Sequence, residues 1–491
     1  MEFLDKIKSF ADENGIFDGR TLIVGLSGGP DSVALLLILK KITDCPIHAV
    51  HINHMLREEA DADESFVRDL CKKNDIPCTF FRFDVKEKAK ELKRSMEDTG
   101  RILRYEAFDN VSKELFGDEY LDKTVICLAH HKDDLSETML MNLFRGSGLD
   151  GLVTPKANSG RVVRPLLCVS KSEILEFLSF ENQDYCEDKT NLEEICTRNV
   201  WRNKIIPSLS DAAVKDPSQA LFETYSLLKD DCDFMAEVAS KIWEKCFDLK
   251  SLTLDIMALE ENHVAISSRL IRMLWKETFG NLTDFTKIHV DAVLGLATDN
   301  GPSGRTLDLP FKRNAFVVRD RLGFCGREDI DEGFLRAVST FGIVGASGLE
   351  PLSLDDVLNT AILPKSHITI KAEIVENIDL IRYNTNSWFC PYFSDITVED
   401  LRFGRLGEDI TFKRAGTEIT SKVTKILADL KVPSKVRGEV FGVYMNDKAL
   451  WIPGVGHAIG FTDEISKERF LDSLGSKGMP DKFLAVHLTE V

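Results

Sequence analysis

Short apolar runs alternate with longer amphipathic stretches through the first part of the chain. An apolar run of about six residues has the length of a buried strand, whereas a mixed stretch of ten or more is typical of a helix. We expect strands at 22–26, 47–54, 78–85, 124–129 and 161–167, and helices at 33–39, 58–73, 86–116 and 130–144. Ser170, followed by Glu173, has the pattern of a capping box and starts another helix. This alternation predicts an α/β fold with a parallel, doubly wound sheet covered on both faces.

The pattern changes after residue 210. Residues 210–279 mix apolar and charged positions with few breakers, which predicts helices. The runs 307–313 and 316–321 predict a hairpin, and residues 420–430 predict a helix that ends before Pro433. We therefore expect an α/β domain at 1–210, a mostly helical domain at 211–330, a strand-rich connecting region at 331–395 and a small α+β domain at 396–491.

Composition narrows the class of protein. No apolar run approaches the length of a membrane span, and the first residues lack the basic start and apolar stretch of a signal peptide. The 11 cysteines are scattered, and none form Cys-x-x-Cys. This predicts free thiols in a reducing cytoplasm and speaks against a disulfide framework, a zinc site or an iron–sulfur site. The net charge of −18 is unfavourable for binding nucleic acid, so an RNA partner would need a local cluster of Lys and Arg.

The segment Ser27-Gly28-Gly29-Pro30-Asp31-Ser32 lies between the first predicted strand and the first predicted helix. A Gly-Gly turn lets the backbone approach a ligand closely, and a helix N-terminus binds phosphate oxygens. The segment is not a Walker loop, because no Gly-Lys-Ser/Thr follows it. The alternative is that the glycines merely end the strand while Asp31 and Ser32 cap the helix.

Polar clusters also stand at the ends of the second and fourth predicted strands. Ligands of parallel sheets bind beyond the carboxyl ends of the strands, so these clusters are expected to share one edge with the glycine loop. The clusters are His51, His54 and Arg57, and His130, Asp133, Asp134 and Glu137. Adjacent histidines on a strand point to opposite faces, so His130 and His131 are not expected to ligate a metal together.

The acids after the fourth strand share one face of a predicted helix. Asp133 and Glu137 are separated by four residues, and Asp134 and Glu137 by three. Like charges at these spacings repel one another, so they indicate a cation, which is either Mg²⁺ or the ammonium group of a substrate. The alternative is that the helix dipole alone stabilises acids in a first turn.

Arginines are the third kind of candidate residue. Arg101 and Arg104 fall at helical spacing with Glu97 and Tyr105, around Gly100. Glycine disfavours a helix, so the stripe points to a close ligand, and an arginine there could stabilise charge on a phosphate. The alternative is a solvated face with a Glu–Arg pair. Arg145 begins a glycine-rich loop, and Arg198 and Arg202 lie in a short basic helix that we expect to end at Pro207.

The segment 27–32 resembles the pyrophosphate loop of the N-type ATP pyrophosphatases, the PP-loop superfamily, which cleave ATP between the α and β phosphates. The remaining motifs of residues 20–210 are similar in order and spacing to those of the tRNA(Ile)-lysidine synthase family. Small departures from the family pattern occur at Gly100 and Leu135. The matching motifs are His51 to His54 with Leu56-Arg57, Glu97 with Arg101, Arg104 and Tyr105, Ala129 to His131 with Asp133-Asp134 and Glu137-Thr138, Arg145 to Gly148 with Gly151-Leu152, Arg164 to Leu167, Asp188 with Asn191, and Arg198-Asn199 with Arg202.

The resemblance implies an adenine nucleotide alpha hydrolase-like catalytic domain at 1–210 that uses ATP and Mg²⁺. The implied reaction joins free lysine to C2 of the wobble cytidine in the isoleucine tRNA with a CAU anticodon. ATP first adenylates the C2 oxygen and releases pyrophosphate. The lysine ε-amine then attacks C2 and AMP leaves, which gives lysidine, so the implied enzyme is a ligase that forms a carbon–nitrogen bond.

The resemblance also implies roles for individual residues. Ser27, Gly28, Gly29, Pro30 and Ser32 would hold the pyrophosphate, with Asp31 beside Mg²⁺ as a catalytic residue. Asp134 and Glu137 would hold either lysine or Mg²⁺, and either Arg101 or Arg104 would face the adenylate. Supporting roles fall to His51, His54, Arg57, His130, Asp133, Arg145, Arg198 and Arg202.

Basic residues in the second half of the chain provide the expected tRNA contacts. Residues 211–330 resemble the tRNA-contacting domain of the family, with Lys312 and Arg313 in the hairpin. Residues 396–491 resemble the C-terminal tRNA-binding domain of the longer family members, with Lys422, Lys425, Lys435 and Arg437. The alternative for these residues is a solvated surface. The sequence does not decide between a monomer and a homodimer.

Three other functions remain open from the sequence. A tRNA thiolase of the same superfamily usually has a cysteine pair or iron–sulfur ligands, which this chain lacks as Cys-x-x-Cys. An amidotransferase-type synthetase would need a glutaminase domain or partner. A non-catalytic RNA-binding protein with a relic loop is the third, although Asp31, Arg104, Asp134 and Glu137 are all present.

Overall fold

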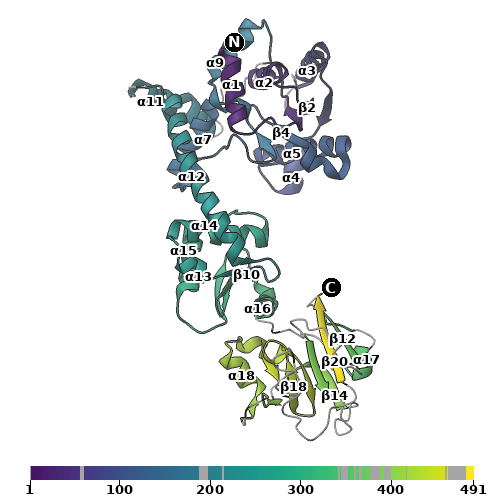
Figure 1. Ribbon diagram of the computed structural model, residues 1–491. Coiled ribbons are helices and arrows are strands. Elements are labelled where there is room, and N and C mark those ends of the chain that lie inside the picture. Colours follow the sequence, from purple (N-terminus) through teal and green to yellow (C-terminus); the bar gives the residue numbers. More distant parts are fainter. Residues whose placement is uncertain are drawn as a thin grey trace. The chain divides into compact units, whose positions relative to one another are not determined.

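The computed structural model describes residues 2–55, 60–186, 197–212, 215–340, 343, 352–358, 361–363, 368–375, 387–391, 400–407, 409–415, 417, 419–458, 462 and 483–490 (Figure 1). Arg57 lies outside these residues, as do Asp188, Asn191 and the side chain of Arg198. The chain forms two compact units, residues 1–234 and 235–491. Within the described ranges, no helix has both the length and the apolar character that a membrane crossing requires.

The first unit contains a sheet of five strands in the order β3-β2-β1-β4-β5. Every neighbouring pair is parallel. Leu22 and Val24 pack into the core on one face of the sheet and Ile23 into the core on the other, because successive side chains of a strand point to opposite faces. The predicted doubly wound α/β fold is confirmed. The strands are β1 (Thr21–Gly25), β2 (Ile47–Asn53), β3 (Cys78–Arg82), β4 (Thr124–Cys127) and β5 (Val162–Val163).

Helices cover both faces of this sheet. On the Leu22 face, apolar side chains of α1 (Glu2–Glu13), α2 (Pro30–Ile42), α3 (Ala60–Asn74) and α9 (Lys171–Phe180) form one core. On the Ile23 face lies α5 (Met96–Phe116), with Phe108 fully buried. A third cluster joins α7 (Lys132–Phe144), α8 (Leu149–Leu152) and the start of α12 (Pro217–Cys246). The remaining short helices are α4 (Val85–Leu92), the 3₁₀ turn Gly117–Glu119 and α6 (Tyr120–Lys123).

Three predictions of local structure in this unit are wrong. The helix expected over 86–116 is interrupted, because Lys93 ends α4 with a φ of 52° and α5 begins at Met96. The strand expected at 161–167 is only β5, and Pro165–Cys168 form a 3₁₀ helix, since Pro165 has no N–H to continue a sheet ladder. The helix expected to end at Pro207 continues, because α10 (Thr197–Val200) leads through a π-helical turn (Trp201–Ile205) into α11 (Ile206–Ala212). Pro207 stands in the first turn of α11, where a missing N–H is tolerated.

The second unit begins with an antiparallel sheet in the order β6-β7-β10-β9-β8. The expected hairpin is present as β8 and β9, but its second strand ends at Val318, and Arg319 turns the chain with a φ of 56°. The expectation of helices throughout 210–279 is wrong at β6 and β7, where Thr253-Leu254-Asp255 alternates polar and apolar side chains as strands do. These elements are β6 (Phe247–Asp248), β7 (Thr253–Asp255), β8 (Arg305–Leu309), β9 (Arg313–Val318), β10 (Arg321–Gly326), α13 (Met257–Glu260), α14 (Val264–Phe279), α15 (Lys287–Thr298) and α16 (Ile330–Ser339).

Two further sheets complete this unit. One has the order β11-β12-β20-β13 and the other β14-β17-β18-β15-β16, with β19 beside β18. They share a core in which the rings of Trp388 and Trp451 stack at 6.1 Å. The expected helix at 420–430 is present as α18 (Val423–Asp429), and the β-rich C-terminal region is confirmed. The other bounds are α17 (Leu354–Leu358), β11 (Ala361–Leu363), β12 (Ile368–Val375), β13 (Ser387–Pro391), β14 (Leu401–Arg405), β15 (Thr411–Phe412), β16 (Ser421–Lys422), β17 (Phe441–Met445), β18 (Lys448–Ile452), β19 (Gly456–His457) and β20 (Phe483–Glu490).

Candidate active site

The loop between β1 and α2 is closed by its own hydroxyl groups. Ser32 Oγ accepts a hydrogen bond from the Ser27 N–H at 3.2 Å and donates one to the Gly29 carbonyl oxygen at 2.9 Å. Gly28 has a φ of +91°, and a Cβ there would lie 3.3 Å from the Cys186 sulfur, so the turn requires glycine. The first N–H groups of α2 have no partner inside the helix and can hold an anion.

Two histidines at the end of β2 differ in their surroundings. His51 is buried, and its Nδ1 lies 2.8 Å from the Leu26 carbonyl oxygen, so it fixes the backbone that enters the loop. Burial lowers the pKa of His54 to about 4, and the neighbouring positive charge of Arg104 adds to the shift. His54 is therefore neutral near pH 7 and offers a hydrogen bond without a charge.

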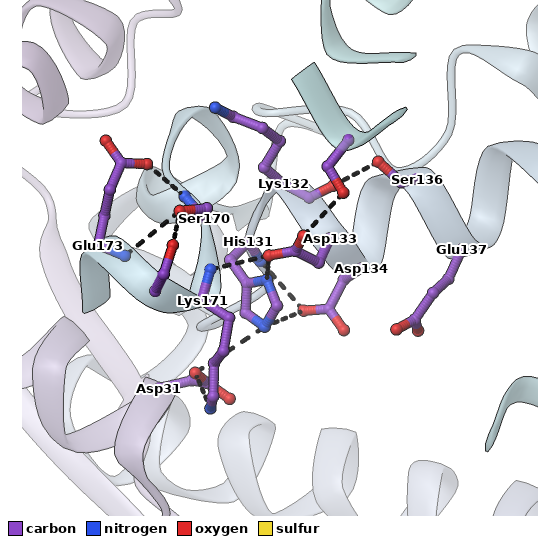
Figure 2. Close-up of polar contacts among 12 residues, drawn as sticks. Asp31, His131, Lys132, Asp133, Asp134, Ser136, Glu137, Ser170, Lys171 and Glu173 are labelled. Atoms are coloured by element: carbon purple, nitrogen blue, oxygen red, sulfur yellow. Dashed lines mark hydrogen bonds and ion pairs between the residues drawn. The ribbon is translucent and has the colours of Figure 1, made fainter. Parts of the chain in front are cut away.

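Asp31 is paired with a lysine that was not among the residues predicted from the sequence. Lys171 Nζ lies 2.5 Å from Asp31 Oδ1 (Figure 2). Lys171 is the first residue of α9, and the predicted capping box of Ser170 and Glu173 at this helix start is confirmed. The sequence could have indicated Lys171 through topology. Its helix follows the fifth predicted strand and therefore begins at the same edge of the sheet as the loop.

His131 lies at the centre of the acidic residues (Figure 2). Its Nδ1 is 3.3 Å from Asp133 Oδ2, and its Nε2 is 3.4 Å from Asp134 Oδ2 and 3.9 Å from Asp31 Oδ1. Burial opposes the charge of this imidazole, but the three carboxylates outweigh burial and raise its pKa. The His131 ring therefore lies between the loop acid and the acids of α7, and these carboxylates favour its protonated form.

Asp133 connects three helices. Its carboxylate accepts hydrogen bonds from the Lys171 N–H at 2.8 Å and from the Ser218 hydroxyl at 2.8 Å, and it contacts His131. Burial works against its charge, yet these three donors hold the pKa of Asp133 well below its usual range. Because its lone pairs are used by α9 and α12, Asp133 is a poor candidate for a ligand-binding group.

Asp134 and Glu137 face a common cation, the guanidinium of Arg202. Arg202 Nε lies 2.5 Å from Glu137 Oε1, and its Nη2 lies 3.0 Å from Asp134 Oδ1 and 3.2 Å from Glu137 Oε2. Glu137 is almost fully buried. Burial alone would lower the pKa of Arg202, but the two carboxylates raise it. Arg202 belongs to the π-helical turn, a rare geometry that is frequent at functional sites.

Three arginines of the first unit form the next set of candidate residues. Arg164 is buried, and its Nε donates to His130 Nδ1 at 3.1 Å. Burial lowers the pKa of Arg164, and Arg101 contributes to that shift. Protein atoms around Arg104 displace water and lower its pKa although the side chain remains accessible, and Arg101 again contributes. The charge of Arg101 therefore acts on both Arg104 and Arg164, and Arg164 was recognised from the sequence only as part of a motif.

The remaining predicted residues are Arg145 in the first unit and the basic residues of the second unit. Arg145 is exposed just beyond the C-terminal end of α7, whereas Asp133 is at its start, and a helix of this length separates them by about 18 Å. Lys312, Lys425 and Lys435 are exposed, and Lys422 pairs with Asp409 at 3.3 Å.

Two of the arginines predicted to bind tRNA have partners in the protein. Arg313 lies over the Phe279 ring at 4.0 Å. Arg437 Nε donates to the Val432 carbonyl oxygen at 2.9 Å. Their charge remains available, but both guanidinium groups also hold the fold.

The side chains of this site suit Mg²⁺ only if phosphate oxygens of a bound nucleotide supply further ligands. Among the described residues, no three His, Cys, Asp or Glu side chains form a group that could hold a metal ion. Mg²⁺ is usually bound by one or two carboxylates together with substrate phosphates. Asp31, beside a loop suited to phosphate, fits this description.

The chain is similar in sequence to known proteins. The family model of the PP-loop domain matches residues 1–209. A tRNA(Ile)-lysidine synthase of Caldanaerobacter subterraneus subsp. tengcongensis is 31% identical over 64% of this chain and 67% of its own. A tRNA(Ile)-lysidine synthase of Clostridium perfringens is 29% identical over 91% of this chain and 94% of its own. Among solved structures, a U34-tRNA thiolase of Methanococcus maripaludis aligns with 46% of this chain and 78% of its own, at 16% identity and a TM-score of 0.39.

Proposed function

The chain belongs to the tRNA(Ile)-lysidine synthase family, and from this we propose that it joins free lysine to C2 of the wobble cytidine in the CAU-anticodon isoleucine tRNA. ATP drives the reaction, and the products are lysidine, AMP and pyrophosphate. The protein is then a ligase that forms a carbon–nitrogen bond. The PP-loop domain accounts for ATP binding.

The observation that carries this proposal is that acidic and basic side chains occupy separate places near the carboxyl ends of the parallel strands. Asp134 and Glu137 already hold a planar cation there, the Arg202 guanidinium. Arg101 and Arg104 on α5 and Arg164 directly after β5 supply positive charge, and Arg101 acts on the pKa values of both other arginines. A site with these two halves is complementary to a cationic amine on one side and to a nucleotide phosphate on the other.

The first proposed step is adenylation of the base. The C2 oxygen of cytidine attacks the α-phosphorus of ATP, and pyrophosphate leaves toward the loop at Ser27 to Ser32. Asp31 would hold Mg²⁺, which neutralises charge on the phosphates when bound. Arg101 or Arg104 would stabilise the charge that builds on the α-phosphate, because a preorganised cation is worth most where charge develops.

The second proposed step uses the acidic residues of α7. The lysine ammonium binds to Asp134 and Glu137 and loses its proton before its nitrogen attacks C2. The bond between C2 and oxygen breaks, and AMP leaves with that oxygen. Since Arg202 already contacts both carboxylates, the amine either shares them with Arg202 or displaces it.

Recognition of the tRNA is proposed to involve the second unit. Lys312 and Arg313 lie at the turn between β8 and β9, and Lys422 and Lys425 lie at the start of α18 with Lys435 and Arg437 beyond it. These side chains would bind backbone phosphates. They place basic groups on a protein whose net charge is −18.

Labelled lysine provides the direct test. The purified protein is incubated with ATP, radiolabelled lysine and unmodified tRNA with the anticodon CAU, and a tRNA with uridine in place of the wobble cytidine is the control. We expect label in the RNA only with ATP and only with the cytidine. ATP cleavage without transfer of lysine would contradict the proposal and would make Asp134 and Glu137 candidates for metal ligands.

A further inference from the structure

An exposed apolar patch lies at the C-terminal end of α7. Phe144 is 74% exposed, and its ring lies 5.2 Å from that of Trp201 in the π-helical turn. Trp201, Ile205 and Leu209 follow at intervals of four residues, which keeps them on one side of their helical segment. Ile205 and Leu209 are exposed, as is Leu143. These five residues, Leu143, Phe144, Trp201, Ile205 and Leu209, are called the α7 patch below.

Single apolar residues on a surface are ordinary, whereas solvent-accessible aromatic rings that contact one another, as those of Phe144 and Trp201 do, form a shared apolar surface that can bind a partner. The α7 patch is assembled from two segments that are far apart in sequence, α7 and the stretch 201–209. The structure leaves Phe144 open to solvent although it touches another aromatic ring. Core packing therefore does not explain the patch.

The patch shares α7 and the π-helical turn with the proposed amine site. Trp201 directly precedes Arg202, which holds Glu137 and Asp134. Phe144 stands seven residues after Glu137 on α7, which is two turns along the same helix face, or about 10 Å. That distance corresponds to roughly three nucleotides of a stacked strand.

Charge favours RNA as the occupant. Arg145 follows Phe144 and is exposed, and no carboxylate of the described chain forms an ion pair with it. Aromatic rings beside an unpaired arginine are the combination that binds unpaired bases, since each ring stacks on a base and the cation faces the backbone.

We propose that the α7 patch stacks unpaired bases of the anticodon loop next to the cytidine that is modified. The proposal rests on the proposed function, because that function places an anticodon loop at this edge of the sheet. Phe144 and Trp201 supply the stacking surfaces, and Arg145 contacts a phosphate. The patch would thereby position the target base over the site without reading its sequence through hydrogen bonds.

The test compares two phenylalanines of nearly equal exposure. Phe144→Ala removes the patch ring, and Phe180→Ala is the matched control at 83% exposure. Phe180 ends α9 next to Glu181, which pairs with Lys41 near the C-terminal end of α2. It therefore lies a helix length from the loop that begins α2. Affinity is measured with an RNA stem-loop carrying the CAU anticodon and 2-aminopurine beside the cytidine.

We expect Phe144→Ala to weaken stem-loop binding by roughly ten- to hundredfold, the usual effect of losing one stacked base. The 2-aminopurine fluorescence should remain unquenched, and Phe144→Trp should restore both signals. The slope of affinity against salt should not change, because no phosphate contact is lost, whereas Arg145→Ala should reduce that slope. Phe180→Ala should behave like the parent, and the melting temperatures of both variants should match it.

Several outcomes would overturn the proposal. If Phe144→Ala binds the stem-loop and quenches 2-aminopurine as the parent does, the patch does not take part in RNA binding. Loss of self-association in that variant, with RNA binding intact, would assign the patch to a second copy of the chain. Failure of the proposed function can be distinguished from failure of this proposal. The parent protein would then transfer no lysine, whatever the affinities of the variants for the stem-loop.

Discussion

At the scale of single residues, each carboxylate that we propose to bind a ligand has an internal cation. Lys171 neutralises Asp31, and Arg202 neutralises Asp134 and Glu137. Buried or partly buried carboxylates that lacked such partners would be costly. The internal cations therefore compete with any Mg²⁺ or ammonium group that binds to the same acids.

Removing Lys171 tests this competition directly. Lys171→Ala should strengthen the binding of Mn²⁺, used as a probe for Mg²⁺, by several-fold in the presence of a non-hydrolysable ATP analogue. The reason is that a salt-bridged Asp31 must release Lys171 before it can ligate a metal. Electron paramagnetic resonance measures the free Mn²⁺. Lys171→Arg keeps the charge and should resemble the parent, and equal Mn²⁺ affinity in all three proteins would show that Asp31 is not a metal ligand.

His131 should give the protein a pH-dependent stability above pH 6.5. Its pKa is raised from the ordinary value of 6.5 by Asp133, Asp134 and Asp31 despite burial. Between pH 6.5 and the raised pKa, the folded protein keeps a proton that the unfolded chain has released, so the free energy of unfolding falls as pH rises. Urea unfolding at several pH values should show this fall in the parent and not in His131→Asn.

Other histidines provide an internal control for that measurement. Burial lowers the pKa values of His48, His51 and His54, so their contributions change below pH 6.5 and have the opposite sign. An identical slope above pH 6.5 in the parent and in His131→Asn would mean that the acids around His131 do not hold its proton.

At the scale of elements, the loop between β1 and α2 depends on one glycine more than on the other. Gly28 has a φ of +91° and close neighbours, whereas Gly29 has a φ of −70° and only the Ser27 hydroxyl within reach of a Cβ. Gly28→Ala should destabilise the protein by about 1–2 kcal/mol, the cost of a side chain in a left-handed conformation. Gly29→Ala should change the free energy of unfolding by less, as measured by urea unfolding, and an equal loss would place the strain elsewhere in the loop.

The elements also show what a sequence can and cannot predict. The four longer strands, the loop and the capping box of α9 follow local patterns, and they were predictable. The contacts of Lys171 with Asp31 and of Arg202 with Glu137 span 140 and 65 residues, and no local pattern encodes such pairs. The short fifth strand and the continuation of the helix through Pro207 depend on where a proline falls relative to hydrogen bonds, which the pattern of apolar positions does not show.

At the scale of the whole molecule, the question is how a protein with a net charge of −18 binds a polyanion. Long-range repulsion between them is screened beyond about 8 Å at physiological ionic strength, so local groups decide. Lys422 and Lys425 lie at the start of α18 on exposed positions, and Lys435 is exposed in the following 3₁₀ helix. Arg313 and Arg437 also contact residues of the fold, whereas Lys422 pairs, among the described residues, only with the exposed Asp409, so these lysines are the more informative sites for mutation.

Reversing two of these charges tests the location of the interface. Lys422→Glu with Lys425→Glu should weaken binding of the full tRNA and reduce the slope of log affinity against log salt by about 2, since each lost phosphate contact lowers that slope by about 0.9. Lys72→Glu with Lys73→Glu, at the exposed C-terminal end of α3, makes the same change in net charge. If the control pair weakens binding equally, net charge and not a local surface governs tRNA affinity. If neither pair changes the salt slope, the lysines of α18 are only a solvated surface.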